Sequence, residues 1–319
     1  MVRVRDELDT SYHQLVMPPL TKDSPTWTRQ FRSCQGALKL DEDTKERVIR
    51  DCDKAFNLEC GSTFWLGASD KPRCSLEKMA QQIFMHFTQQ VEFDASRSGV
   101  EWWVQMRLGG DGEAEPGVMG EDITLHWDKD EELVNTIGTH MTPYVGTVTY
   151  LTNYGAPTVV LNKAAPKQAE DVEGCYGSSR HLDAGKSIAF DGRLLHGALT
   201  GFIQPEMWQR RVTFLANVWL DHRPLQVNRF PQELLHRFAV SMDEIEFDLS
   251  AEEEILSVSI QDRATMGPWP SSDGGSQDTS TLSSRFRVDG RHHHVQVRYS
   301  CAEGFDACNF SGEKFENGF

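Results

Sequence analysis

"YVGTVTYLTNYGAPTVVLN", residues 144–162, contains two apolar, β-branched runs separated by a tyrosine and a glycine. Valine and threonine favour extended backbone because their branched side chains pack well on a pleated surface. A glycine between two such runs is a turn signal. This stretch therefore predicts two strands joined by a turn.

The same texture continues on both sides of this pair. Further runs rich in aromatic and β-branched residues are "GVEWWVQMRL" (99–108), "ITLHW" (123–127), "KSIAFDGRLLHGAL" (186–199) and "RRVTFLANVWL" (210–220). Many short strands without alternating helices favour an antiparallel sandwich or jelly roll over a parallel sheet. The predicted fold class is mainly β with flanking helices.

Three helices are predicted beside these strands. Apolar residues recur at helical spacing over 41–57 and, more strongly, over 75–91, where Ser75 is the predicted N-cap. These two helices are expected to cover one face of a sheet. A third helix is predicted over 231–245, "PQELLHRFAVSMDEI".

The pattern of elements divides the chain into three regions that form one compact unit. Residues 1–98 are predicted to be an N-terminal helical support region, and 99–245 the β core. Residues 246–319 are predicted to be a C-terminal extension. It holds a flexible linker at 267–281 and a hairpin formed by "SSRFRVDG" (283–290) and "HHHVQVRYS" (292–300).

Composition narrows the classes of partner. The 319-residue chain has a formal net charge of −16, whereas nucleic-acid binding usually needs a basic face. Nucleic acid is therefore not expected, and neutral or cationic substrates suit this charge better than polyanions. No apolar run is long enough for a membrane span, so none is expected. The start "MVRVRDELDT" has charges where a signal peptide needs apolar residues, so no signal peptide is expected. We therefore expect a cytoplasmic protein, and its oligomeric state is not predicted.

The cysteine content also favours a cytoplasmic protein. There are seven, an odd number, and no C-x-x-C pair occurs. Reduced thiols in a cytosol-like compartment are the simplest interpretation. A disulfide between Cys301 and Cys308 is the alternative.

Three residues at the ends of predicted strands could bind a metal. His126 and Asp128 are two positions apart, so they lie on the same face of an extended strand. His196 follows at the end of a later strand. Two histidines and one carboxylate form the facial triad that binds non-haem Fe(II) and leaves coordination positions open. A His-x-Asp triplet alone occurs often by chance, and it is the order and strand context of all three that carry the prediction.

Taken together, "HWD" (126–128), "LLHG" (194–197) and "RRVTF" (210–214) resemble the pattern of the Fe(II)- and 2-oxoglutarate-dependent dioxygenases. The stretches "TVTYLTNYGAPTVVL" (147–161) and "GKSIAFDGRLLHG" (185–197) resemble the prolyl-hydroxylase-like branch of that family. The resemblance covers about residues 100–222. It implies a double-stranded β-helix, that is, a jelly-roll or cupin-like core.

The resemblance implies a role for each matching residue. His126, Asp128 and His196 would be the catalytic Fe(II) ligands. A basic side chain would bind the distal carboxylate of 2-oxoglutarate, and either Arg210 or Arg211 could supply it. Arg211 is favoured because it directly precedes the "VT" step. Tyr150 would support the same carboxylate through its hydroxyl, or else pack in the core.

The implied activity is hydroxylation of an unactivated C–H bond in a small molecule or a peptidyl side chain. It would consume O2 and 2-oxoglutarate and release succinate and CO2, with ascorbate as a candidate reductant. Two alternatives stay open. One is a cupin-like metalloenzyme that does not use 2-oxoglutarate, and the other is a non-catalytic binding protein that retains the fold.

Other residues are secondary candidates. Trp103 and Gln105 share one strand face and could line the mouth of a pocket, and Asn217 lies on the same strand face as Arg211. The charged run from Lys129 onward is predicted to be a solvated loop. The histidines 292–294 could form a second metal patch, but a surface strand is favoured.

Overall fold

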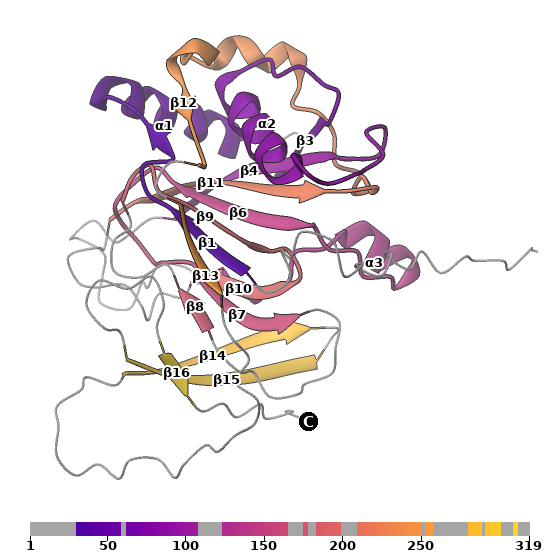
Figure 1. Ribbon diagram of the computed structural model, residues 1–319, viewed down its shortest axis with the longest axis vertical. Helices are drawn as coiled ribbons and strands as arrows, with labels where there is room; N and C mark the ends of the chain where they lie inside the picture. Colours follow the sequence, from indigo (N-terminus) through magenta and orange to yellow (C-terminus); the bar gives the residue numbers. More distant parts are fainter. Residues whose placement is uncertain are drawn as a thin grey trace, which may run out of the picture.

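The computed structural model describes ten segments of the chain: residues 30–58, 62–107, 123–164, 175–177, 183–198, 209–250, 253–257, 280–288, 291–300 and 309–311. Their centre is a seven-stranded antiparallel sheet (Figure 1). From one edge to the other its strands are β13 (Glu253–Ser257), β1 (Gln30–Cys34), β9 (Ser187–Asp191), β6 (Val145–Tyr150), β11 (Arg211–Trp219), β4 (Gly99–Arg107) and β3 (Phe64–Gly67).

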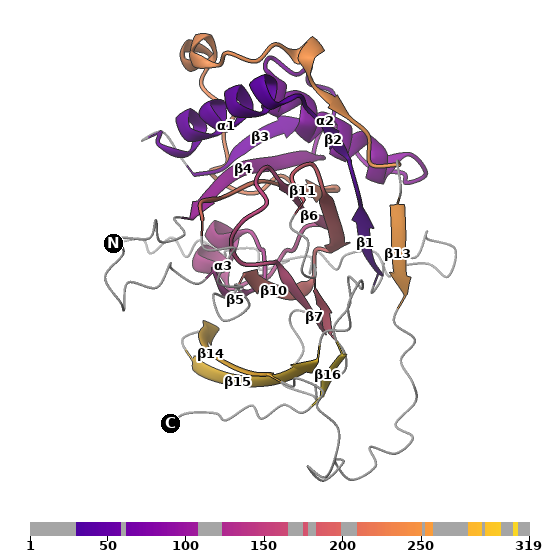
Figure 2. The same ribbon diagram turned by 90° about the vertical axis from the view of Figure 1, so that its left-hand side faces the viewer.

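A second, four-stranded antiparallel sheet carries two of the candidate metal ligands. Its strands, in order, are β5 (Ile123–His126), β10 (Leu194–Ala198), β7 (Val159–Ala164) and β8 (Cys175–Gly177). It lies across from the seven-stranded sheet (Figure 2). A cluster of buried apolar side chains from both sheets fills the space between them: Phe31, Val148, Tyr150, Val160, Ile188, Phe190 and Leu194. The chain thus forms a β-rich fold with two facing sheets.

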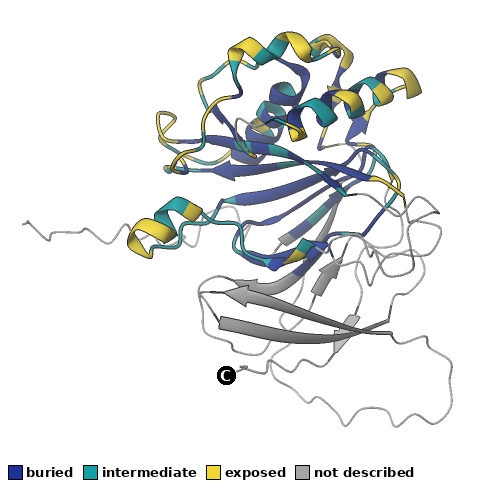
Figure 3. Cartoon of the chain, turned by 180° about the vertical axis from the view of Figure 1, so that it is seen from behind, coloured by how far each residue is buried: buried dark blue, intermediate teal, exposed yellow. Residues whose placement is uncertain are grey.

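Two helices cover the other face of the seven-stranded sheet. These are α1 (Glu42–Phe56) and α2 (Ser75–Thr88), both of which contact β4 and β11 (Figures 1 and 3). Alternate residues of β4, such as Trp102 and Val104, are buried beneath them, whereas Glu101, Trp103 and Gln105 are only half-buried on the opposite face. β4 therefore presents an apolar face to the helices, and its opposite face carries both polar and aromatic side chains.

The predicted helices over 41–57 and 75–91 are confirmed, although the expected cap of the second is wrong. The N-cap of α2 is Cys74, one position before Ser75, and it makes no capping hydrogen bond through its side chain. Glu77 instead accepts a hydrogen bond from the backbone N–H of Arg73, at 2.8 Å. A carboxylate in the first turn thus binds the backbone just before the helix.

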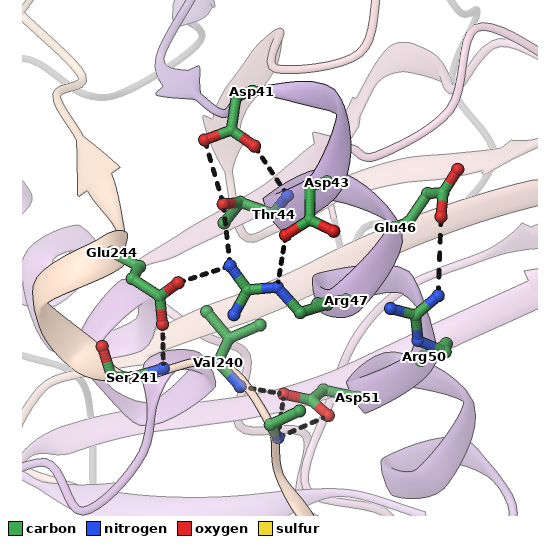
Figure 4. A network of polar contacts seen from close by, with 11 residues as sticks. Asp41, Asp43, Thr44, Glu46, Arg47, Arg50, Asp51, Val240, Ser241 and Glu244 are labelled. Atoms are coloured by element: carbon green, nitrogen blue, oxygen red, sulfur yellow. Dashed lines mark hydrogen bonds and ion pairs between the residues drawn. The ribbon is translucent and has the colours of Figure 1, made fainter.

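The helix predicted over 231–245 is wrong. This segment forms two short 3-10 helices, η3 (Gln232–Arg237) and η4 (Met242–Glu244). Between them, the buried carboxylate of Asp51 on α1 accepts hydrogen bonds from the backbone N–H groups of Ala239 and Val240, at 2.8–2.9 Å (Figure 4). Those N–H groups cannot also bond within a continuous helix, so a contact with α1 divides the segment.

A second contact ties α1 to η4. Arg47 donates to Asp43 on its own helix at 2.9 Å and also pairs with Glu244 (Figure 4). Glu244 accepts from the backbone N–H of Ser241, which completes a capping box at the start of η4. The helical layer is therefore joined to the chain that follows β11.

The remaining strands lie outside the two main sheets. β2 (Leu38–Lys39) pairs with β12 (Glu246–Phe247), and β14 (Ser280–Val288), β15 (Arg291–Ser300) and β16 (Asn309–Ser311) form a three-stranded sheet. The pairing of β14 with β15 confirms the predicted hairpin. Most of the predicted linker, Cys301 and Cys308 lie outside the described residues. So do the side chains of the histidines 292–294.

The seven-stranded sheet draws strands from all three predicted regions, since β1 and β3 come from 1–98 and β13 from 246–319. The division of the chain into domains stays a prediction. Within the described segments, Cys34, Cys52 and Cys74 are buried. None of the helices that the structure describes has the length and apolar composition needed to cross a membrane.

Candidate metal centre

The structure brings His126, Asp128 and His196 together. Each offers one ligand atom, and these three atoms all lie within 4.8 Å of one another. The Nε2 atoms of His126 and His196 are 3.5 and 3.4 Å from the two carboxylate oxygens of Asp128. The histidines are register partners on β5 and β10, and their ring centroids are 4.5 Å apart. Antiparallel pairing thus places two residues that are 70 positions apart side by side.

Backbone carbonyls fix the orientation of both imidazole rings. The Nδ1 of His126 lies 2.7 Å from the carbonyl oxygen of Thr124, and the Nδ1 of His196 lies 2.9 Å from that of Leu194. A carbonyl oxygen only accepts, so each Nδ1 carries the proton and donates it. Each Nε2 faces Asp128 and, once it has lost its own proton, offers its lone pair to a metal ion there.

Local charge sets the ionisation of these ligands. Burial raises the pKa of Asp128, but the charges and hydrogen bonds of His196 and His126 outweigh burial and hold that pKa well below its ordinary value. Burial lowers the pKa of His126, and the hydrogen bond and charge of Asp128 outweigh it, so the pKa of His126 is raised. Asp128 is therefore a carboxylate at neutral pH, as a metal ligand must be.

Asn217 on β11 fixes Asp128 from the seven-stranded sheet. Its Nδ2 donates to Oδ2 of Asp128 at 3.0 Å, and Asn217 itself is buried. Groups that hydrogen-bond a metal ligand fix its orientation and its basicity. Strand alternation predicts Asn217 on the same face of β11 as Arg211, and the structure places its side chain against a candidate ligand.

Replacing Asn217 with alanine is expected to weaken Mn(II) binding by about 10–100-fold, because Asp128 loses the donor that orients it. Isothermal titration of the metal-free protein with Mn(II) measures this. The matched control is Asn228→Ala, which truncates the same side chain at an exposed position. Equal affinities for both variants would show that Asn217 does not support the site.

The two candidate arginines point to opposite faces of the sheet. Arg210 precedes β11, is about half exposed and forms an ion pair with Asp53 on α1. Arg211 is 3% exposed and lies on the inner face. Its guanidinium donates to the carbonyl of Ala156 at 2.9 Å and to the hydroxyls of Thr158 and Thr213, both at 3.2 Å. Only Arg211 therefore shares a strand face with Asn217, which contacts the candidate metal ligand Asp128.

Arg211 is a buried cation held by neutral groups. Burial lowers its pKa, and the neighbouring Tyr150, which hydrogen-bonds to the guanidinium, acts in the opposite direction. The guanidinium carbon lies 5.6 Å from the ring centroid of the buried Tyr150, whose hydroxyl accepts from the backbone N–H of Thr158. No carboxylate of the described segments pairs with Arg211. Its surroundings therefore suit an anionic ligand.

The turn glycine between the first two predicted strands makes room for this arginine. Gly155 has φ +93°, and a Cβ at this position would lie 2.5 Å from the Cβ of Arg211. Both the backbone conformation and the close approach exclude a side chain there. The residues that join β6 to β7 thus enclose the aliphatic part of Arg211.

The predicted solvated loop after Asp128 is wrong. Helix α3 (Glu131–Ile137) begins there, and its N-cap Asp130 is 1% exposed. The Asp130 carboxylate accepts from the backbone N–H groups of Leu133 and Leu225, both at 3.0 Å, and lies 2.8 Å from Nε2 of His222. A run of charges indicated solvent, but one of its members is a buried anchor between α3 and the segment after β11.

Replacing Asp130 with alanine is expected to lower the free energy of unfolding by about 3 kcal/mol, since a helix cap and two further buried hydrogen bonds are lost together. Urea unfolding followed by circular dichroism measures this. Glu131→Gln removes the same charge from the next, exposed position and should stay within about 0.5 kcal/mol of the wild type. A similar loss in both variants would contradict an anchoring role.

Sequence patterns missed Glu101 and His222 as parts of this region, and they placed Asp130 in a solvated loop although it is buried. Strand alternation could have found Glu101, because it shares a face with Trp103 and Gln105. Gln105 lies 3.4 Å from the guanidinium of Arg211, so it contacts the predicted cosubstrate site. Nothing local in the sequence indicates that His222 pairs with Asp130, 92 positions earlier.

Comparisons with known proteins give only weak likenesses. No family model matches the chain, and no curated protein matches it. Among solved structures, a prolyl-4-hydroxylase from Pseudomonas putida is 12% identical, with a TM-score of 0.38, over 62% of this chain and 95% of the other. HygX from Streptomyces hygroscopicus with nickel and 2-oxoglutarate bound is 13% identical, with a TM-score of 0.29, over 66% and 94%. Likenesses of this size do not establish a shared fold.

Proposed function

We propose that this protein is an Fe(II)- and 2-oxoglutarate-dependent oxygenase that hydroxylates an unactivated C–H bond of a small molecule or a peptidyl side chain. The observation that carries the proposal is a pair of sites that lie between the two facing sheets. One is the His126–Asp128–His196 cluster, and the other is the buried cation Arg211.

The donor set suits Fe(II). Two imidazoles and one carboxylate are the ligands of the facial triad, which leaves positions open for other molecules. Both Nε2 atoms are available because the Nδ1 atoms bind carbonyls, and Asn217 holds Asp128. Bound iron, 2-oxoglutarate and O2 would supply the oxidising chemistry and release succinate and CO2.

Arg211 would bind the carboxylate of 2-oxoglutarate that is remote from the metal. Asn217 and Arg211 are six positions apart on β11, about 20 Å along an extended strand. The guanidinium reaches back toward the cluster, because it contacts Thr213 on the same strand and Gln105 on β4. 2-Oxoglutarate would bind the metal through its keto-acid end and Arg211 through its free carboxylate.

Around these ligands the chain supplies orientation and apolar surroundings. The centroid of the Phe190 ring lies 4.8 Å from that of His196. Leu194, on the same strand as His196, and Val160, on the neighbouring strand β7, are also buried. Apolar walls exclude water and strengthen the electrostatic interactions within a site. The two facing sheets, with the histidines on one and Arg211 on the other, also support the predicted double-stranded β-helix, which remains part of this proposal.

A direct test measures succinate formation by the Fe(II)-loaded protein with 2-oxoglutarate and O2, with and without ascorbate and candidate substrates. We expect slow turnover without substrate and faster turnover with the correct one. If the wild type binds neither Fe(II) nor 2-oxoglutarate, the proposal fails. Metal binding without 2-oxoglutarate binding would instead favour the cupin-like metalloenzyme, and binding of both without turnover would favour the binding protein.

A further inference from the structure

Glu101 is an acidic side chain beside the candidate metal ligands that the proposed chemistry does not use. It lies on β4 and is the register partner of Asn217 on β11. Directly opposed residues on neighbouring strands have Cβ atoms about 5 Å apart. Asn217 in turn donates to Asp128. Glu101 is therefore one side chain away from a candidate metal ligand, on the same face of the sheet.

The contacts of Glu101 hold its carboxylate in place without neutralising it. The indole Nε1 of Trp219 donates to its Oε2 at 3.0 Å, and the hydroxyl of Thr63 also hydrogen-bonds to it. No lysine, arginine or histidine within the described segments forms an ion pair with Glu101. The two nearby aspartates differ in this respect, since Asp128 lies between two histidines and Asp130 contacts His222.

The pKa of Glu101 is that of a carboxylate without a cationic partner. Burial, together with the charges of Asp128 and Asp130, raises the pKa of Glu101 to about 7, and the hydrogen bonds from Thr63 and Trp219 counteract this only in part. A cation at this position would relieve the repulsion among the carboxylates.

The strand face that carries Glu101 also carries an aromatic residue. Trp103 is two positions further along β4, so it lies on the same face, and it is half-buried. The faces of tryptophan rings attract cations. A half-buried carboxylate and a half-buried indole on one strand face form a surface that suits an ammonium or guanidinium group better than a neutral one.

We propose that Glu101, with Trp103 beside it, binds a cationic group of the substrate, an ammonium or a guanidinium, and thereby positions it at the metal centre. This inference rests on the proposed function and names its substrate class. Glu101 would act on specificity and would not be a metal ligand.

The test uses Mn(II) as a paramagnetic probe in the full-length protein with 2-oxoglutarate. Paired small molecules that differ in charge are added: n-butylguanidinium with n-butylurea, and n-butylammonium with n-butanol. Proton relaxation of each molecule reports binding close to the metal. We expect the cationic member of at least one pair to be relaxed about tenfold more strongly, as loss of a charge-assisted hydrogen bond implies.

Glu101→Gln should remove this preference, because glutamine keeps the shape and can still accept from Trp219 and Thr63. The matched control is Glu46→Gln, the same change at an exposed position on α1, on the other side of the sheet. It should retain the preference. Both variants should still bind Mn(II), because neither Glu101 nor Glu46 is a metal ligand.

The outcomes separate this inference from the proposed function. If the wild type binds Mn(II) but relaxes cationic and neutral molecules equally, or if Glu101→Gln keeps the preference, the role of Glu101 is refuted and the oxygenase proposal stands. If the wild type does not bind Mn(II), the metal centre itself is refuted, and this inference falls with it.

Discussion

Asp128→Ala is expected to reduce Mn(II) or Fe(II) affinity by more than about 100-fold and to abolish 2-oxoglutarate turnover. Loss of a group that merely supports a ligand costs about 10–100-fold, so loss of the ligand itself should cost more. Asp128 is also the residue that both histidines approach, at 3.4 and 3.5 Å. Its removal leaves two imidazoles without the negative charge between them. Isothermal titration with Mn(II) and a succinate assay measure the two effects.

His196→Ala should show the same losses, because it removes another of the three candidate ligands, the one on β10. The control is His236→Ala, which makes the same substitution at an exposed position on η3. Wild-type metal affinity in Asp128→Ala would refute the assignment of the centre. Thermal unfolding of each variant shows whether a loss of binding merely reflects a loss of fold.

The second large effect is expected for 2-oxoglutarate binding. Arg211→Ala should weaken it by more than about 100-fold, since it removes the buried cation that would pair with the remote carboxylate. Arg211→Lys keeps the charge but loses the planar, two-pronged donor, so an intermediate loss of about tenfold is expected. Titration of the Mn(II)-loaded protein with 2-oxoglutarate measures both variants.

The neighbouring arginine provides the control for this prediction. Arg210 carries the same charge on the next residue, but it pairs with Asp53 on α1 at a partly exposed position. Arg210→Ala should change 2-oxoglutarate affinity by no more than about twofold, because exposed ion pairs contribute little. Equal losses for Arg210→Ala and Arg211→Ala would mean that a general positive charge, and not a specific site, attracts the anion.

Much of the β structure was predictable because its signal is local. The strands β6, β10 and β11 follow directly from runs of β-branched and apolar residues, and α1 and α2 follow from apolar residues at helical spacing. The three metal-binding candidates were also visible, since i, i+2 spacing on a strand places His126 and Asp128 on one face. Their meeting with His196 is a matter of strand pairing, which the structure supplies.

The failures arise from contacts between segments far apart in the sequence. The predicted helix at 231–245 is divided by Asp51, which lies almost 190 positions earlier and captures two of its N–H groups. Asp130 is buried by partners after β11 that no local pattern relates to it. The choice between Arg210 and Arg211 depended on which face of β11 lies inward. Alternation alone could not decide this, because both faces of the strand are buried.

The opposite directions of Arg210 and Arg211 have a consequence for how this chain could change over time. Strand faces alternate with every residue, so inserting one residue just before Val212 would turn Arg211 toward the helical layer, and deleting one would turn Arg210 toward the inner site. The composition would hardly change, yet a cation would be lost either from the helical layer or from the inner site. Homologues are therefore expected to tolerate varied side chains along β11 far more readily than any change in its length.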